Sequence, residues 1–323
     1  MSEPSGGALS TPNPQIWPWR GHRISWIGQG PSFTGARPDP SSGLPAAVLI
    51  HGFGASLGHW RHNIPVLARQ VDVFALDLLG FGASDKPRSR LSGEPEQAGT
   101  EQYGFALWAA QVADFVTEHV QRRPVHLIGN SIGGVVALAA ARLLQERGEA
   151  PCQVVLIDCA QRTLDEKRVG ELPAWERAGR PLLKRFVRER WLLAPLFRFL
   201  ARPEAIRRVL AYAYPSGRNV DDELVQLLYR PATDPGAVES FRGFVNLFDD
   251  LLAPELLADM GLPVRMLWGE KDPWENPAEA RQWAERFSCI RELRILEGLG
   301  HCPHDEDPEQ VNAILTEWIG RTP

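Results

Sequence analysis

The stretch Gly129-Asn130-Ser131-Ile132-Gly133-Gly134 decides the fold, because a G-x-S-x-G pattern coincides there with a change from strand-like to helix-like periodicity. Residues 125–129 form a short aliphatic run typical of a buried strand, and residues 132–145 have helical spacing. Glycines remove the side chains that would clash in so sharp a turn, and the hydroxyl of Ser131 is then exposed on it. The alternative is a Gly-rich turn whose serine merely caps the helix. The strand-turn-helix setting favours a nucleophile at Ser131.

The same strand signal recurs along the chain and alternates with helix-period stretches. Further aliphatic runs lie at residues 46–50, 71–79, 154–157, 264–268 and 293–296. Further helical spacing is found at residues 106–120, 277–287 and 309–319. A hairpin is expected at residues 16–28, around Arg20-Gly21-His22. Alternating strands and helices predict an α/β protein with a mostly parallel, doubly wound sheet.

One long interval breaks this alternation. Residues 161–262 show no buried-strand pattern, but they contain helical segments at 181–200 and 204–213. Prolines that break helices stand at 203, 215, 231 and 235. This pattern indicates a helical cap inserted into the sheet domain. The predicted organisation is a disordered lead at residues 1–14, a core domain at 15–160 and 263–323, and the cap at 161–262.

The composition excludes several classes of protein. The chain of 323 residues is 44% hydrophobic and 23% charged, which is the profile of a globular protein. Its 35 basic and 40 acidic residues give a net charge of −5, which argues against a dedicated nucleic-acid binder. Four cysteines without a C-x-x-C pair predict neither a zinc site nor a disulfide framework, and they fit a reducing compartment. No secretion signal and no apolar run of about 18 residues is found, so we expect a cytoplasmic protein.

A serine nucleophile needs a general base, and the base needs an acid that orients it. In hydrolases with this turn, the order along the chain is serine, acid, histidine. Asp272 directly follows a predicted strand, at the carboxyl edge of the sheet, where catalytic groups gather. His301 also follows a predicted strand, and the preceding Gly300 lets its loop turn the imidazole toward the serine. These positions predict a triad of Ser131, Asp272 and His301.

Other residues compete for the same roles. Asp158 ends the run 154–157, at another sheet edge close to the serine, and is the alternative acid. Glu270 lies two residues before Asp272, and either could instead be a turn residue. His304 is three residues from His301 but lacks the preceding glycine.

An acyl transfer also needs an oxyanion hole and a substrate pocket. The backbone N–H groups of Ile132, directly after the nucleophile, and of Phe53, in the loop His51-Gly52-Phe53-Gly54, are the expected oxyanion donors. His51 is interpreted as a structural residue of that loop. Trp60 and Trp274 are candidate pocket residues.

Together these segments resemble the α/β-hydrolase superfamily over residues 17–318. Within it, the chain resembles the cyanobacterial and plastid branch that includes chlorophyll dephytylases and pheophytinases. The matching segments are residues 17–22, 51–54, 60–67, 129–134, 268–275 and 300–306. The resemblance implies hydrolysis of an ester between a pigment acid and a long isoprenoid alcohol, with Ser131, His301 and Asp272 as the triad. Asp158 departs from the branch, where an amide or small polar residue is expected.

The identity of the nucleophile separates this chain from relatives with other chemistry. Residues 77–87 resemble dehalogenases and epoxide hydrolases, which attack with an aspartate, whereas Ser131 predicts an acyl-enzyme. The expected substrate is a hydrophobic small-molecule ester, and neither cofactor nor metal is expected. The alternatives are a carbon–carbon bond hydrolase of the meta-cleavage-product type and a non-catalytic binding protein of the same fold.

The cap has an unusual charge. Residues 161–210 carry 13 Arg or Lys against 6 Asp or Glu, although the whole chain is acidic. Basic residues there interleave with apolar residues at helical spacing: Leu182, Leu183, Phe186, Val187, Leu193, Leu196, Phe197 and Leu200. The favoured interpretation is that this apolar stripe packs on the core domain. The alternative is peripheral contact with an anionic, for example thylakoid, membrane surface.

Overall fold

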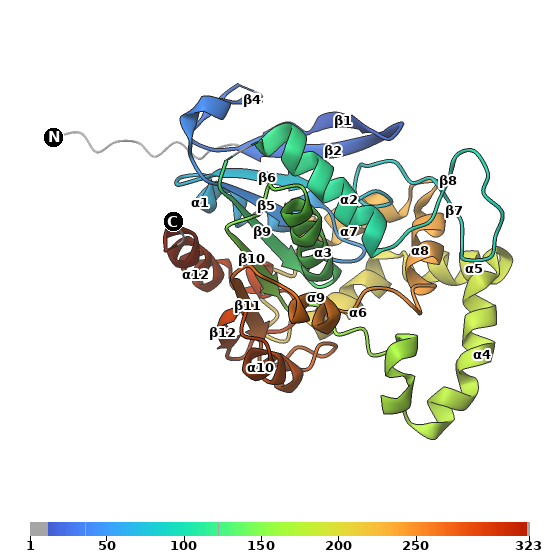
Figure 1. Cartoon of the computed structure of the whole chain (residues 1–323). Helices are drawn as coiled ribbons and strands as arrows, with labels where there is room; N and C mark the ends of the chain where they lie inside the picture. Colours follow the sequence, from blue (N-terminus) through green and yellow to red (C-terminus); the bar gives the residue numbers. More distant parts are fainter. Residues whose placement is uncertain (1–11, 36, 122, 322–323) are drawn as a thin grey trace.

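An eight-stranded, mostly parallel sheet forms the centre of the computed structural model, which describes residues 12–35, 37–121 and 123–321 (Figure 1). The strand order is β1-β2-β6-β5-β9-β10-β11-β12. β1 and β2 form an antiparallel hairpin, β2 runs antiparallel to β6, and the other neighbours are parallel. The strands are β1 (Gln15–Trp19), β2 (His22–Gln29), β5 (Ala46–Ile50), β6 (Asp72–Leu76), β9 (Val125–Asn130), β10 (Gln153–Ile157), β11 (Val264–Gly269) and β12 (Ile290–Leu296). The predicted α/β fold is confirmed.

Two short strand pairs lie outside this sheet. They are β3 (Phe33–Thr34) with β4 (Arg37–Pro38), and β7 (Arg88–Ser89) with β8 (Thr100–Glu101). Of the predicted lead at residues 1–14, residues 1–11 lie outside the described part of the chain. No helix within the described residues is both long and apolar enough to cross a bilayer.

Helices cover both faces of the sheet, so successive residues of a strand point into different cores. In β5, Ala46, Val48 and Ile50 belong to one apolar cluster, and Ala47 and Leu49 belong to the other. The first cluster includes residues of α2 (Phe105–Phe115), α3 (Ile132–Glu146), α9 (Ala253–Ala258) and α10 (Pro277–Arg286). The second includes residues of α1 (Ile64–Leu67) and α12 (Pro308–Gly320). Burial on both faces explains why the parallel strands appear in the sequence as continuous aliphatic runs.

Between β10 and β11 the described chain forms helices and no strand. They are a 3-10 helix (Glu166–Glu171), α4 (Ala174–Arg188), α5 (Arg190–Leu200), α6 (Pro203–Ala213), α7 (Asp222–Ala232), α8 (Ala237–Val245) and α9. The single helix expected at residues 181–200 is two helices separated at Glu189, and the first contains Pro181 in its interior. Because proline is disfavoured inside a helix, the sequence pattern placed the start too late. Pro231 likewise lies inside α7, near its end. The cap boundaries at 161 and 262 stay a prediction.

The apolar stripe of the cap does not pack on the core domain as expected. Leu182, Leu196 and Leu200 are exposed, whereas Val187 and Leu193 are buried. The reason is the position of α4 and α5, which pack on each other and on α8 at the edge of the molecule away from the chain termini (Figure 1). Only one narrow side of each helix therefore meets other apolar side chains.

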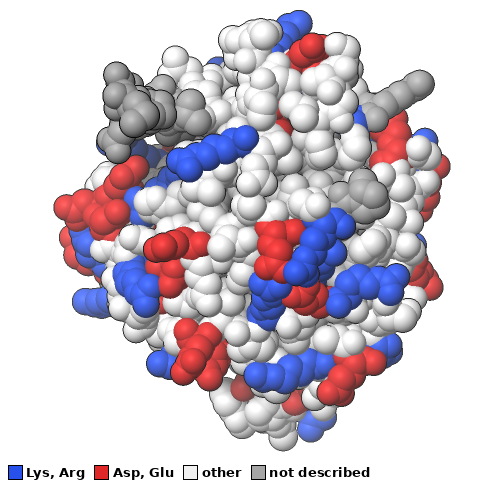
Figure 2. Space-filling model, turned by 90° about the vertical axis from the view of Figure 1, so that its left-hand side faces the viewer, with Lys and Arg blue, Asp and Glu red and all other residues white. Residues whose placement is uncertain are grey.

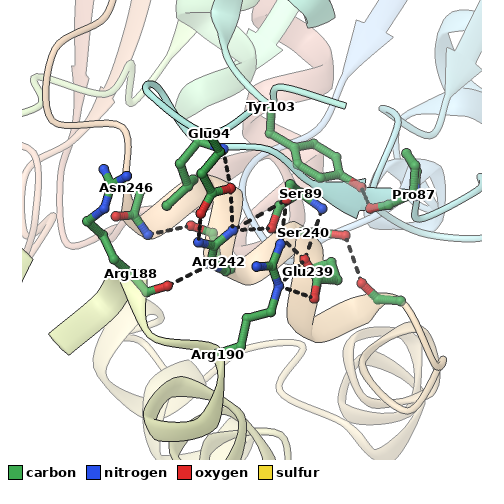
Figure 3. Close-up of polar contacts among 12 residues, drawn as sticks. Pro87, Ser89, Glu94, Tyr103, Arg188, Arg190, Glu239, Ser240, Arg242 and Asn246 are labelled. Atoms are coloured by element: carbon green, nitrogen blue, oxygen red, sulfur yellow. Dashed lines mark hydrogen bonds and ion pairs between the residues drawn. The ribbon is translucent and has the colours of Figure 1, made fainter. Parts of the chain in front are cut away.

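A polar network fastens this edge of the cap to the segment that carries β7 (Figure 3). Arg242 of α8 is buried, and its Nη2 lies 2.5 Å from Glu94 Oε1. Arg190, at the start of α5, places Nε 2.9 Å from Glu239 Oε1. Glu239 Oε2 accepts the backbone N–H of Ser89 at 2.9 Å. Ion pairs and hydrogen bonds thus hold α5 and α8 to the segment of the core domain that carries β7.

Candidate active site

Ser131 lies on the turn between β9 and α3 in a backbone conformation that few side chains adopt, with φ of 56°. Its N–H donates to the carbonyl oxygen of Ile157 at 2.9 Å. A Cβ atom on Gly129 would lie 2.1 Å from the Gly133 oxygen, and one on Gly133 would lie 2.3 Å from the Ile50 oxygen. Close backbone packing on both sides of the turn is therefore the physical reason for the two glycines.

His301 and Asp272 form a buried acid-base pair. His301 Nδ1 lies 2.8 Å from Asp272 Oδ2, and Asp272 Oδ1 accepts the N–H groups of Trp274 at 2.8 Å and Glu275 at 3.1 Å. Burial raises the pKa of Asp272, but the hydrogen bond and charge of His301, with smaller contributions from Asp158 and the backbone, outweigh it and lower the pKa. An ionised Asp272 holds the Nδ1–H of His301, which makes Nε2 the basic nitrogen.

The structure brings Ser131 and His301 to one pocket, together with the two expected oxyanion donors. Phe53 and Ile132 both line this pocket. Within the described residues, neither of their N–H groups donates to another group. Ile132 is the first residue of α3, where a backbone N–H has no partner inside the helix. Two available N–H groups on the pocket that Ser131 also lines are candidates for an oxyanion hole.

Asp158 lies next to this pair but does not contact His301. It directly follows β10 in a left-handed conformation with φ of 44°, and its Oδ1 accepts the N–H of Gly269 at 2.8 Å. Burial, the charge of Asp272 and a hydrogen bond with Asp272 raise the pKa of Asp158 well above its usual range. The surroundings of Asp158 therefore favour its neutral form, whereas those of Asp272 favour the charged form.

The remaining alternatives lie apart from the pair. Glu270 is exposed and accepts the N–H of Gly298. His304 is fully buried, and burial lowers its pKa well below the usual value. His51 is also fully buried and accepts the N–H of Leu78 through Nε2, so it holds the loop together.

The pocket is an apolar cavity of about 830 Å³ between core and cap. Its wall combines the sheet edge that carries Ser131 with cap side chains: Leu164, Leu183, Val187, Val209, Leu210, Leu228, Phe244, Val245, Leu247 and Phe248. Trp274 lines the pocket, with its ring 4.8 Å from that of His301. The expectation that Trp60 lines the pocket is wrong, because Trp60 is fully buried in the apolar cluster that includes residues of α12, and it packs on His304.

Several residues of the site were not predicted from the sequence. Asn130 Nδ2 donates to the His301 carbonyl oxygen at 3.1 Å and so ties the serine turn to the histidine loop. The N–H of His301 donates to the Ala213 oxygen of the cap at 2.9 Å. Glu275 lines the pocket, and burial raises its pKa to about 7. Only Asn130 had a sequence signal, its place inside the serine motif.

Known proteins resemble this chain over most of its length. The model of the alpha/beta hydrolase family matches residues 47–314. Pheophytinase of Arabidopsis thaliana is 27% identical over 314 residues, which cover 85% of this chain and 61% of the relative. Pimeloyl-[acyl-carrier protein] methyl ester esterase of Aeromonas hydrophila is 28% identical over 282 residues, which cover 85% of this chain and 96% of the relative. The solved structure of the epoxide hydrolase CorEH has a similar fold, with a TM-score of 0.72 at 20% identity, and the match covers 95% of this chain and 98% of that one.

Proposed function

Because this chain belongs to the alpha/beta hydrolase family, we propose that it is a serine hydrolase that cleaves carboxylic esters through an acyl-enzyme. The observation that carries the proposal is the 2.8 Å contact between His301 Nδ1 and Asp272 Oδ2, with His301 and Ser131 on one pocket. A histidine oriented in this way is a base for a serine hydroxyl.

In the first half of the reaction, Ser131 Oγ attacks the ester carbonyl carbon and its proton moves to His301 Nε2. The N–H groups of Phe53 and Ile132 donate to the resulting oxyanion. When the tetrahedral intermediate collapses, the bond from carbon to the alcohol oxygen breaks and His301 protonates the leaving alcohol. The acyl group is then attached to Ser131.

In the second half, His301 takes a proton from a water molecule, whose oxygen attacks the acyl carbon. Collapse of this second intermediate breaks the bond to Ser131 Oγ, and His301 returns the proton to Ser131. One ester and one water become one acid and one alcohol, and the protein is restored.

The preferred substrate in this proposal is a phytyl ester of a chlorophyll-type pigment. The apolar wall of the pocket suits a long hydrocarbon group, and its volume of about 830 Å³ is that of a pocket for a sizeable ligand. The relationship to the plant pheophytinase supports the same substrate class. The bacterial methyl ester esterase supports ester hydrolysis without favouring a pigment.

A carbon–carbon hydrolase of the meta-cleavage type would act on an anionic dienoate, for which a free pocket cation is favourable. Arg162 lines the pocket, but its Nη2 lies 2.6 Å from Asp165 Oδ2. The charge of Arg162 is therefore largely balanced within the protein, which favours a neutral ester.

The test is product analysis after the purified chain is incubated with chlorophyll, pheophytin, simple acyl esters and a coloured dienoate. We expect release of phytol from the pigment esters and no bleaching of the dienoate. A fluorophosphonate probe should label the wild type and fail to label Ser131→Ala, which should lower kcat by about a million-fold. If folded wild type is not labelled, the chain is a binding protein of this fold and the proposal fails.

A further inference from the structure

Exposed large apolar side chains are concentrated on α4, α5 and α6. Of the thirteen large hydrophobic side chains exposed among the described residues, nine lie on these three helices. Trp175, Leu182 and Trp191 are exposed by 75%, 74% and 71%. The other six are Leu183, Leu196, Phe199, Leu200, Val209 and Tyr212. We call these nine residues the cap patch. So many exposed apolar side chains on neighbouring helices mark an interaction surface.

The helices of the cap patch carry a positive charge that the protein does not balance. Residues 174–213 contain ten Arg or Lys and three Asp or Glu. Arg180, Lys184, Arg190 and Arg207 pair with carboxylates. Five exposed arginines form no ion pair with any described residue: Arg177, Arg185, Arg198, Arg202 and Arg208. Apolar side chains among unpaired arginines fit a partner that is both apolar and anionic.

The cap patch is continuous with the active-site pocket. Leu183 of α4 and Val209 of α6 belong to the patch and also line the pocket. The ring of Tyr212 lies 6.0 Å from that of Trp274, and the ring of Trp274 lies 4.8 Å from that of His301. An apolar path therefore leads from the outer surface of the cap to the catalytic histidine.

We propose that the cap patch docks on an anionic lipid bilayer. Trp175, Leu182 and Trp191 enter the interface between headgroups and acyl chains, where amphipathic aromatic rings are favoured. The unpaired arginines remain at the level of the lipid phosphates. Docking in this orientation places the mouth of the pocket at the membrane, so that a lipid-soluble ester enters without crossing water. The entry of an ester rests on the proposed ester hydrolysis, whereas docking itself does not.

The rest of the molecule indicates which side faces the membrane. Figure 2 shows the face on the side of the chain termini, opposite to the cap, where acidic and basic side chains lie next to one another. Elements of that side also pair their charges internally, as Arg294 does with Glu292 and Glu317. In the network of Figure 3, Arg190 at the start of α5 is bound to Glu239 of α8. This contact holds the cap patch in one orientation relative to the pocket.

The test is flotation of the full chain with phosphatidylcholine vesicles, with and without phosphatidylglycerol. We expect the chain to float only with the anionic vesicles, and to be released by salt. One basic residue near such a surface strengthens partitioning roughly fivefold, so the triple variant Arg177→Gln, Arg185→Gln, Arg198→Gln should bind about a hundredfold more weakly. The matched control, Arg69→Gln, Arg281→Gln, Arg291→Gln, removes the same charge from exposed positions outside the cap and should bind as wild type does.

A second variant tests the apolar part of the cap patch. Trp175→Ser with Trp191→Ser should lose vesicle binding, while its circular dichroism and its hydrolysis of a water-soluble short-chain ester stay as in wild type. The proposal is overturned by equal flotation with neutral vesicles, by equal effects of the two arginine triples, or by a patch-mediated dimer that binds no vesicle. Normal flotation of a chain that hydrolyses no ester would refute the proposed function and leave docking intact.

Discussion

Asp158 and Asp272 are neighbouring carboxyl groups whose surroundings give them different protonation states. Asp272 accepts hydrogen bonds from two backbone N–H groups and from His301, which favours its charged form. Asp158 is enclosed by the core beside that charge, so burial and Asp272 both favour its neutral form. In its neutral form Asp158 can donate to Asp272, which would make it a positioning residue for the proposed acid.

This difference gives a test of the acid assignment. Asp272→Asn should lower kcat by about ten-thousand-fold, because an amide opposite Nδ1 favours the wrong tautomer of His301. Asp158→Asn should lower kcat by less than about tenfold, because asparagine still accepts the Gly269 N–H and still donates toward Asp272. Steady-state kinetics, with active sites counted by fluorophosphonate labelling, compare the two variants. A severe Asp158→Asn with a nearly silent Asp272→Asn would reverse the assignment.

Glu275 should make stability depend on pH. Burial, opposed by the charge of His301 and the N–H of Gln161, raises the pKa of Glu275 from 4.5 to about 7. Between these values the folded chain keeps a proton that the unfolded chain has lost, so this group lowers stability as pH rises through that window. Glu275→Gln has no such proton and still accepts the Gln161 N–H.

Thermal unfolding at about pH 4.5 and about pH 8 measures this effect. Tm of Glu275→Gln should match wild type at the lower pH and exceed it at the higher pH. A difference in Tm that is the same at both pH values would show that Glu275 is not titrating in this range.

At the scale of elements, the serine turn depends on glycine because β9, α3 and β5 approach one another through backbone atoms. Gly133→Ala should destabilise the chain by about 3 kcal/mol, since its Cβ would lie 2.3 Å from the Ile50 oxygen. Gly179→Ala in α4 is the control, because its Cβ would meet no atom within 4 Å. Replacing that helical glycine should stabilise by about 0.5–1 kcal/mol. Urea unfolding of both variants checks the prediction, which fails if the two changes have the same sign.

The sheet and the positions of the loops that carry Asp272 and His301 were predictable because each is specified by a local pattern. β5 is buried on both faces and its sequence is therefore aliphatic throughout. Asp272 and His301 each follow a parallel strand, so topology alone brings their loops to the edge that carries Ser131.

Side-chain direction and packing partners were not predictable in the same way. In the sequence, Trp60 and Trp274 both follow predicted strands and were equal candidates for the pocket. In the structure, Trp60 ends the 3-10 helix Leu57–Trp60 and points into the core, whereas the adjacent His59 lines the pocket. Helical spacing identified the apolar residues of α4 and α5 without showing that these helices would pack mainly on each other and on α8. The contact from the His301 N–H to Ala213 uses a carbonyl oxygen, which every residue type has.

At the scale of the whole molecule, core and cap share one pocket. The core supplies Ser131 and His301, the proposed catalytic groups, and the cap supplies most of the apolar wall. The cap also holds the loop that carries His301, because Ala213 at the end of α6 accepts the His301 N–H. Any change that loosens the cap should therefore affect both stability and the geometry of the base.

Arg242 is the buried centre of the network that joins α8 to the segment around β7, and its loss should loosen the cap. Arg242→Met leaves Glu94 Oε1 and the Arg188 carbonyl oxygen without the donor that Arg242 supplies, at a cost of about 3 kcal/mol. Arg294→Met is the matched control, because its ion pairs with Glu292 and Glu317 are partly exposed and worth less than about 1 kcal/mol. Urea unfolding measures both, and limited proteolysis should cut α4 or α5 earlier in Arg242→Met only.

The effect of Arg242→Met should also depend on pH with a definite sign. The hydrogen bond from Arg242 lowers the pKa of Glu94 to about 2, from 4.5. A carboxyl group with a lowered pKa stabilises the fold fully above 4.5, and this stabilisation is lost as pH falls toward 2. The gap in unfolding free energy between wild type and Arg242→Met should therefore be smaller at about pH 3 than at about pH 7. A gap that stays constant, or a control variant as unstable as Arg242→Met, would mean that this ion pair does not hold the cap to the core.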